Sequence, residues 1–323
     1  MIIYKKNKMI YNKFIDNKYT VIKGLGQGSY GKAFLAIDND DQNKVVIKEI
    51  NLNRIGEKAR NKVIQEGEIL YQLEHKNIIK FIQFFLDKPK NRAYIIMEFA
   101  AEGDLSKKIR EQRESGLYFK ESIIIRWFFE LCNAVKCCHD YNIIHRDIKP
   151  ANIFLTEDNH IKLGDFGVSK ILNSKTSKAQ SLQGTPLYMS PEVSNKENYS
   201  FSCDIWSLGV ILYELCTLNS PMVLFLNKFD INNIFTDNYS TNIKKLIQKM
   251  LKNNPNERPN INEVLEYIKQ IKEERKRKYL INKKKLDNKE NHDISFNMRY
   301  NNLFKMMLIL IIIALIQILI KIF

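Results

Sequence analysis

The stretch of sequence that decides the fold is His145-Arg146-Asp147-Ile148-Lys149-Pro150-Ala151-Asn152. Its side chains suit the transfer of a phosphoryl group, a reaction that asks a protein for positioning and charge stabilisation more than for covalent chemistry. Asp147 can accept the proton of a substrate hydroxyl, and Lys149 can steady the migrating group. Asn152 adds an amide oxygen, a ligand type that Mg²⁺ accepts.

A second motif, Asp165-Phe166-Gly167, follows in the same part of the chain. Each motif alone is a common loop sequence, but the two in this order define a single site. Asp165 and Asn152 are then the expected Mg²⁺ ligands, and ATP is the expected phosphoryl donor. We therefore predict ATP and Mg²⁺ as the cofactors.

A glycine-rich loop precedes these motifs, with Gly26, Gly28 and Gly31 at the positions of a G-x-G-x-x-G pattern. Glycine lets backbone N–H groups turn tightly toward phosphate oxygens. The pattern alone also occurs in dinucleotide-binding folds, where a helix follows it. Here a β-like run, residues 33–37, follows instead of a helix. This context favours a loop that covers the phosphates of a nucleoside triphosphate.

The strand after this lid carries Lys48, and a later amphipathic stretch carries Glu66. An ion pair between them would orient the ammonium toward the α and β phosphates. Further on, a strand ends in a small-residue turn. We expect a hinge there, with Met97 behind the adenine and the backbone of Glu98 and Ala100 supplying its hydrogen bonds.

Four longer stretches make the family resemblance specific: Val46-Ile47-Lys48-Glu49-Ile50-Asn51, Leu163-Gly164-Asp165-Phe166-Gly167, Gly184-Thr185-Pro186-Leu187-Tyr188-Met189-Ser190-Pro191-Glu192 and Leu212-Tyr213-Glu214-Leu215-Cys216-Thr217-Leu218. From Tyr19 to about Ile271 the chain resembles the NIMA-related (NEK) serine/threonine protein kinases. It departs from that family between Thr217 and Leu246, where it is shorter.

The resemblance implies an α+β protein kinase fold of two lobes, with a β-rich N-lobe at 19–97 and a helical C-lobe at 101–271 in a domain of 19–271. It implies transfer of the ATP γ-phosphoryl to protein Ser or Thr, Lys149 being the mark of that class. The expected nucleotide-binding residues are Leu25, Gly26, Gly28, Gly31, Ala33, Val46, Lys48, Met97, Glu98, Ala100 and Phe154. The expected catalytic set is Asp147, Lys149, Lys48 and Glu66.

Regulation is expected in the segment after the metal-binding motif. Arg146 directly precedes Asp147, so a cation can receive a phosphate docking from that segment. Ser181 has the spacing of a primary activating site, and Thr185 can bridge to the catalytic loop. Two more distant contacts are also expected. Asp204 should brace the catalytic loop, and Arg258 should pair with Glu192.

The remaining composition is less specific. The net charge is +15, but Lys, Asn and Ile are frequent throughout, and no reader motif for nucleic acid accompanies the charge, so no specific nucleic-acid partner is expected. The five cysteines show no metal-ligand spacing, which favours free thiols in the core. Residues 1–18 form an N-terminal extension without a signal-like apolar run.

The C-terminal part holds a basic linker, 272–302, and an apolar stretch, 303–323. Its length approaches a bilayer core once the flanking lysines are counted, which predicts a tail anchor in an internal membrane with the kinase domain in the cytosol. A helix packed on the domain and an oligomerisation strip are the alternatives. For the whole chain, the alternative to an active kinase is a membrane-tethered pseudokinase.

Overall fold

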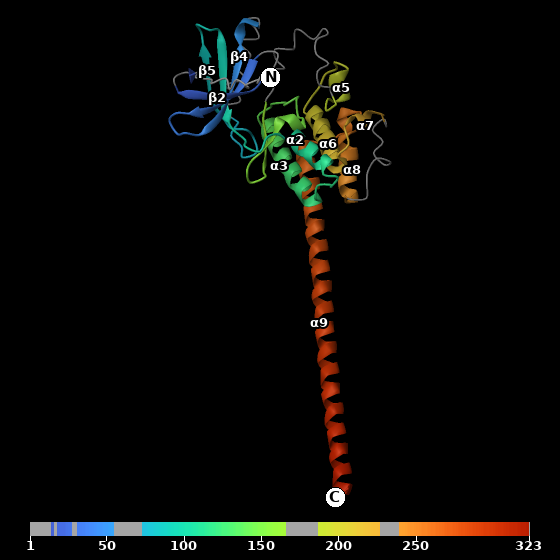
Figure 1. The fold of residues 1–323 in the computed structure, drawn as a ribbon. Coiled ribbons are helices and arrows are strands. Elements are labelled where there is room, and N and C mark those ends of the chain that lie inside the picture. The colour runs from blue at the N-terminus through green and yellow to red at the C-terminus, as the bar shows by residue number, and fades with distance from the viewer. Residues whose placement is uncertain are drawn as a thin grey trace, which may run out of the picture. The chain divides into compact units, whose positions relative to one another are not determined.

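In the computed structural model of the chain, the described residues are 14–15, 18–27, 31–54, 73–165, 187–226 and 239–322. In the last helix, the side chains of residue 282 and of residues 285–297 and 313–322 lie outside the description. The chain divides into two compact units, Met1–Ile268 and Lys269–Phe323. The first holds a β-rich lobe followed by a helical lobe (Figure 1).

The β-rich lobe is one antiparallel sheet with the strand order β1-β2-β3-β4-β6-β5. Its strands are β1 (Phe14–Ile15), β2 (Tyr19–Gln27), β3 (Gly31–Asp38), β4 (Lys44–Asn51), β5 (Phe81–Asp87) and β6 (Arg92–Glu98). A short 3-10 helix, η1 (Leu52–Arg54), follows β4. The strands expected at 33–37 and around Lys48 are present as β3 and β4, and β1 adds an edge strand from the N-terminal extension.

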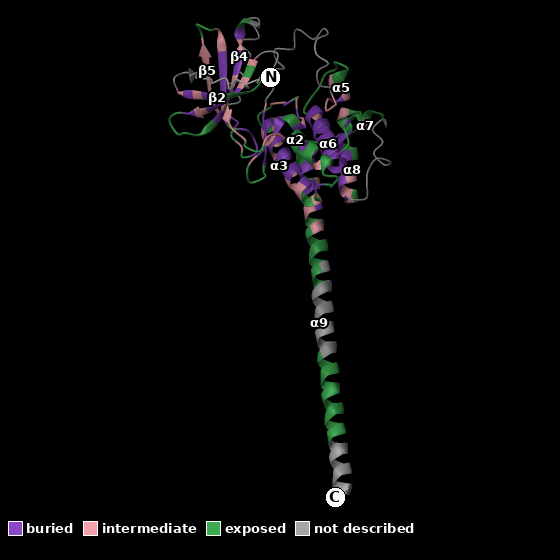
Figure 2. Ribbon diagram, in the orientation of Figure 1, coloured by how far each residue is buried: buried purple, intermediate pink, exposed green. Residues whose placement is uncertain are grey.

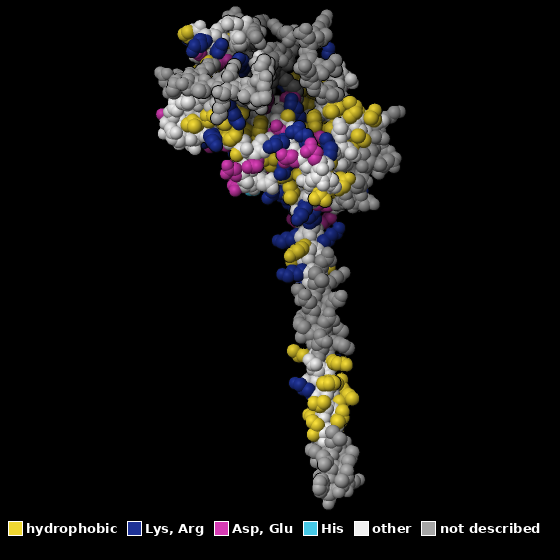
Figure 3. All heavy atoms as spheres, viewed as in Figure 1, with side chains coloured by type: hydrophobic (Ala, Val, Ile, Leu, Met, Phe, Trp, Pro, Cys, Tyr) yellow, Lys and Arg dark blue, Asp and Glu magenta, His cyan; other side chains and the backbone are white. Residues whose placement is uncertain are grey.

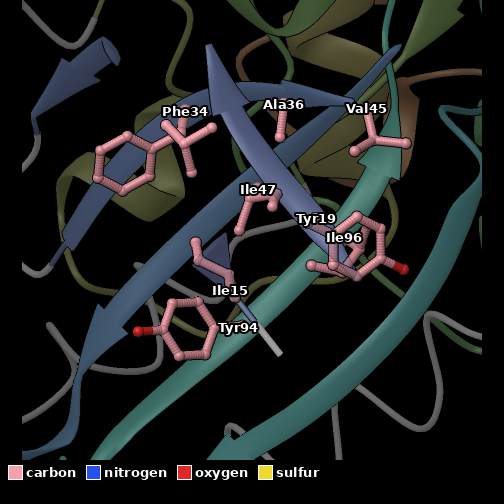
Figure 4. Close-up of a cluster of buried hydrophobic side chains, with 9 residues drawn as sticks. Ile15, Tyr19, Phe34, Ala36, Val45, Ile47, Tyr94 and Ile96 are labelled. Carbon is pink, nitrogen blue, oxygen red and sulfur yellow. The ribbon is translucent and has the colours of Figure 1, made fainter. Parts of the chain in front are cut away.

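Alternation along β4 separates two faces of this sheet. Val45 and Ile47 are buried with Tyr19, Ile96 and other apolar side chains in one cluster, which Figure 4 shows gathered from β1, β2, β3, β4 and β6. Successive side chains of a strand point to opposite faces. Val46 and Lys48 therefore lie on the other face, where the pocket described below is found.

The helical lobe is organised around two buried helices. Its elements are α2 (Leu105–Glu114), α3 (Glu121–Asp140), η2 (Pro150–Asn152), β7 (Ile153–Leu155), β8 (Ile161–Leu163), α5 (Pro191–Ser194), α6 (Ser202–Thr217), α7 (Met222–Leu226), α8 (Thr241–Met250), η3 (Pro255–Glu257) and the start of α9 (Ile261–Ile322). Every residue of α6 from Cys203 on is buried, as expected of a helix that is apolar on all sides. Figure 2 shows this buried centre. Helix α3 also carries many buried side chains. All five cysteines are free thiols, buried or partly buried, as predicted.

The predicted contact between Glu192 and Arg258 is confirmed. Arg258 donates from both terminal nitrogens to the two carboxylate oxygens of Glu192, over 2.7 and 2.8 Å. Its remaining donors reach the backbone oxygens of Lys252, Ser202 and Asn253. Burial by itself would raise the pKa of Glu192, but the hydrogen bonds from Arg258 lower it, so the carboxylate stays charged.

The second unit, Lys269–Phe323, lies within α9 up to Ile322. Its described side chains form a basic part near Lys283 and an apolar part from Leu303 to Ile312, and those apolar side chains are exposed. Figure 3 shows both parts along the helix.

The predicted membrane-spanning helix is not supported. In the part of the chain that the structure describes, no helix is long and apolar enough to cross a membrane.

Candidate active site

The backbone of the catalytic loop is hydrogen-bonded to the buried carboxylate of Asp204, which lies at the start of α6. Asp204 accepts hydrogen bonds from the backbone N–H groups of His145 and Arg146, each 2.9 Å long. His139 at the end of α3 contacts the same carboxylate through Nε2 at 2.9 Å. The predicted brace is confirmed. It lets Arg146 hold a left-handed backbone with φ of 65°, which a side chain other than glycine adopts only at a cost.

Two side chains of the loop contact the carboxylate of a third residue, Asp147. Lys149 Nζ lies 2.9 Å from Asp147 Oδ2, and Asn152 Nδ2 donates to the same oxygen over 3.0 Å. Asn152 Nδ2 also donates to the backbone oxygen of Asp147 over 2.8 Å. The amide nitrogen is therefore occupied inside the loop, and η2, which begins at Pro150, fixes the turn that brings Asn152 back.

Asp165 is positioned through the residue before it. Gly164 donates its N–H to the backbone oxygen of Asn152 over 2.9 Å, and its own oxygen lies 3.2 Å from His145 Nε2. A Cβ on Gly164 would meet the side chains of Ile79 and Phe154 at 2.8 and 2.9 Å. Only glycine therefore fits at position 164 without displacing the side chains of Ile79 and Phe154.

His145 links the two motifs in its neutral form. It is fully buried, and burial lowers the pKa of its imidazole. Its Nδ1 accepts from the backbone N–H of Asp147 at 3.3 Å, so its Nε2–H is the donor to Gly164. One neutral tautomer therefore satisfies both contacts and links Asp147 to Gly164, the residue before Asp165.

Above the loops, Lys48 on β4 forms an ion pair with Asp165. Both lie on a pocket of about 430 Å³. The pocket is lined by Leu25, Gly26, Ala33, Val46, Lys48, Ile79, Met97, Glu98, Phe99, Ala100, Gly103, Asp104, Ala151, Asn152, Phe154 and Asp165. Its volume lies in the range usual for small-molecule sites, and it is walled largely by apolar side chains. We refer to Lys48, Asn152 and Asp165 as its polar end.

The donor set at this polar end fits Mg²⁺. The amide nitrogen of Asn152 donates its hydrogen bonds to Asp147, so the side-chain oxygen of Asn152 is the atom that can coordinate a metal ion. Asp165 adds a carboxylate, of which Oδ1 is paired with Lys48. Hard oxygen ligands of this kind are what Mg²⁺ prefers, and it commonly takes one or two from the protein and the rest from phosphates and water.

Most of the residues predicted to bind nucleotide line this one pocket. Gly31 is an exception, since a Cβ there would lie 1.9 Å from the backbone oxygen of Glu49. Its glycine is therefore required by the close pairing of β3 with β4. Gly28, Glu66, Ser181 and Thr185 lie outside the described residues, and so does any contact between Glu66 and Lys48.

Arg146, predicted to receive a phosphate, has a protein contact in this structure. Its guanidinium lies over the ring of Tyr199, 4.9 Å from the centroid. Such a cation–π contact contributes about 0.5–1 kcal/mol at an exposed site. A phosphate docking on Arg146 would act on a side chain whose position is already restricted.

The sequence reasoning missed several pocket residues. Gly103 and Asp104 lie beyond the hinge, where Asp104 also caps α2 by accepting from the N–H of Lys107 over 2.9 Å. A capping residue before a helical stretch is a readable signal, and it could have identified Asp104 as the residue that begins α2, although not as part of the pocket. Ile79 had no such signal, because its place depends on backbone pairing with Leu163 across the two lobes.

A two-lobed domain that holds this loop, this aspartate and a nucleotide-sized pocket between the lobes belongs to the phosphoryl-transfer class. Comparison with known proteins gives the family. The family model for the protein kinase domain matches residues 19–268, and the chain belongs to the protein kinase family. The predicted family resemblance is confirmed.

The curated relatives are NIMA-related kinases. The chain is 39% identical to serine/threonine-protein kinase Nek1 of Mus musculus, over 77% of this chain and 21% of the relative. It is 38% identical to Nek5 of Homo sapiens, over 77% of this chain and 36% of the relative. For Nek2 of Homo sapiens the identity is 35%, over 77% and 58%. The chain thus spans between about a fifth and three fifths of the length of these relatives.

Proposed function

We propose that this chain is an active serine/threonine protein kinase of the NIMA-related type, which transfers the γ-phosphoryl group of ATP to a Ser or Thr hydroxyl. The observation that carries the proposal is that Asn152 and Asp165 line one pocket, while the carboxylate of Asp147 is hydrogen-bonded to Asn152. A pseudokinase would be expected to lack one of these groups, and the described catalytic residues are intact.

Each residue has a role in this proposal. Asp147 accepts the proton of the substrate hydroxyl. Lys149, whose Nζ lies 2.9 Å from Asp147 Oδ2, stabilises charge on the transferred group. Lys48 binds the α and β phosphates once they compete for its ion pair with Asp165. When bound, Mg²⁺ neutralises phosphate charge, held by Asn152 and Asp165.

Substrate choice follows from the residues beside the loop. Where an arginine-directed kinase carries an acid after the catalytic-loop proline, this chain has Ala151. Leu187, which is partly exposed, offers an apolar surface for the residue after the target. We therefore propose no requirement for arginine upstream of the target. Membrane attachment is not part of this proposal, because the described helices give it no support.

The test measures Mg²⁺-dependent transfer of radiolabelled phosphate from ATP to a Ser/Thr peptide library. Asp147→Asn and Asp165→Ala should each lower kcat by at least about 10²-fold, as is typical when one charge-stabilising group is lost. Asp140→Asn is the matched control, since Asp140 pairs with Lys136 on the surface of α3. If the two site variants keep near wild-type transfer, the proposal is wrong.

A further inference from the structure

The hinge residue Glu98 uses its side chain as well as its backbone. Its backbone N–H donates to the oxygen of Lys80 over 3.0 Å, and its Oε1 accepts from the backbone N–H of Lys80 over 2.8 Å. The two bonds form a closed ring between the last residue of β6 and the residue before β5. The carboxylate of Glu98 is thereby fixed in one orientation.

The same oxygen meets a cation from the other lobe. Lys162 on β8 places Nζ 2.7 Å from Oε1 of Glu98. The two side chains are 20% and 27% exposed, so water screens this pair less than it screens a surface pair. The contact therefore joins the hinge strand to the strand that leads to Asp165.

Lys162 is placed by the pairing of β7 with β8. It lies opposite Phe154, and directly opposed residues of an antiparallel pair share a face. Phe154 lines the nucleotide pocket, whereas the neighbours of Lys162 in β8, Ile161 and Leu163, are buried on the opposite face. The lysine thus reaches the hinge from beside the floor of the pocket.

A backbone ladder fixes the other side of β8. Leu163 donates to the oxygen of Asn77, and Ile79 donates to the oxygen of Leu163, each over 2.8 Å. Asn77 Nδ2 also donates to the oxygen of Ile161 over 2.9 Å. Strand β8 is thus hydrogen-bonded to the segment that precedes β5, and the Lys162 side chain links it to the end of β6.

We propose that Lys162 is a positioning residue for the nucleotide: its ion pair with Glu98 sets the distance between the hinge strand and the pocket floor at Phe154, into which adenine fits. This inference rests on the proposed function, because adenine is the ligand that the spacing serves. The pair acts on the base and leaves the phosphate groups to Lys48 and Asp165. Its effect therefore falls on nucleotide affinity and leaves the transfer step largely intact.

The test measures KM for ATP, kcat and the dissociation constant for adenosine, which has no phosphates. Lys162→Met should raise KM and the adenosine constant by the same factor, about three- to tenfold, the range for one partly exposed pair of contacting groups. The value of kcat should change by less than about twofold. Lys162→Arg, which keeps the charge, should recover most of the lost affinity.

A double-mutant cycle identifies the partner. Glu98→Gln keeps an acceptor for the N–H of Lys80 but loses the charge, so adding Lys162→Met to it should weaken adenosine binding little further. Lys136→Met removes an exposed ion pair with Asp140 and is the control for loss of a lysine.

Two results would overturn the proposal. One is unchanged adenosine affinity in Lys162→Met, and the other is additive effects in the cycle. A lower melting temperature with unchanged affinity would likewise show a purely structural pair. A wild-type chain that binds adenosine but transfers no phosphate would instead contradict the proposed function, and the adenosine measurements would still decide the role of Lys162.

Discussion

The catalytic loop and the C-terminal helix of the second unit differ in how far the rest of the chain constrains them. The loop is held by partners from distant segments, because Asp204 accepts from the backbone of His145 and Arg146, and Gly164 contacts the side chain of His145. The described apolar side chains of α9 from Leu303 to Ile312 are exposed. The function of a motif can therefore be predicted from sequence where its residues need particular partners. The hydropathy of a helix alone does not indicate its role.

The largest effect is expected at the buried ion pair between Arg258 and Glu192, which joins two segments of the helical lobe. Arg258→Met leaves Glu192 charged and buried without its two hydrogen bonds, which should cost about 3–5 kcal/mol of unfolding free energy. Chemical denaturation measures it. Arg277→Met, which removes an exposed contact of 4.0 Å with Glu273, is the control and should change little. A loss below 1 kcal/mol at Arg258 would contradict the structural role.

The brace beneath the loop gives the second largest effect. Asp204→Asn replaces one accepting oxygen by an NH₂ group that faces a backbone N–H of His145 or Arg146. The loop should shift, and a displacement near 1 Å costs on the order of 10²-fold in rate. Steady-state kinetics measures kcat with saturating ATP, again beside Asp140→Asn. Wild-type kcat in Asp204→Asn would show that the loop keeps its geometry without the brace.

The neutral His145 gives a smaller, pH-dependent effect. Burial lowers the pKa of its imidazole, so below about pH 6.5 the unfolded chain binds this proton and the folded chain resists it. The stability that His145 gives is then complete above pH 6.5 and is lost as the pH falls. The difference in unfolding free energy between the wild type and His145→Gln should narrow from pH 7.5 to pH 5.

The same measurement has an internal check. Burial raises the pKa of Glu214, an effect of opposite sign that both proteins share and that cancels in the difference. A gap that stays constant or widens toward pH 5 would mean that His145 takes up a proton in the folded chain.

The tail should give the smallest effect. Leu308→Lys and Ile311→Lys change side chains that are 51% and 53% exposed, so the unfolding free energy should move by no more than about 0.5 kcal/mol. Transfer to a peptide should be unchanged. A destabilisation above about 1 kcal/mol would show that these apolar side chains contribute to a folded core, and the contrast with the loop would then fail.

Much of the site could be read from the sequence, because phosphoryl transfer limits which residue types serve at each step. Asp147, Lys149 and Asn152 lie in one short loop, so their spacing alone brings them together. Lys48 had to be placed by the strand pattern around it, and the structure pairs it with Asp165, a contact that the sequence analysis did not name. The expected partner Glu66 lies outside the described residues.

The kinase family, the catalytic loop and the strands that carry the pocket could be predicted from the sequence, because those features depend on local spacing and alternation. Three features became apparent only from the packing of the folded chain: Lys162 contacts Glu98, Gly164 has no room for a side chain, and Gly31 is needed for strand pairing. These contacts join residues far apart in the chain. Their distances depend on how the two lobes pack, which no local pattern specifies.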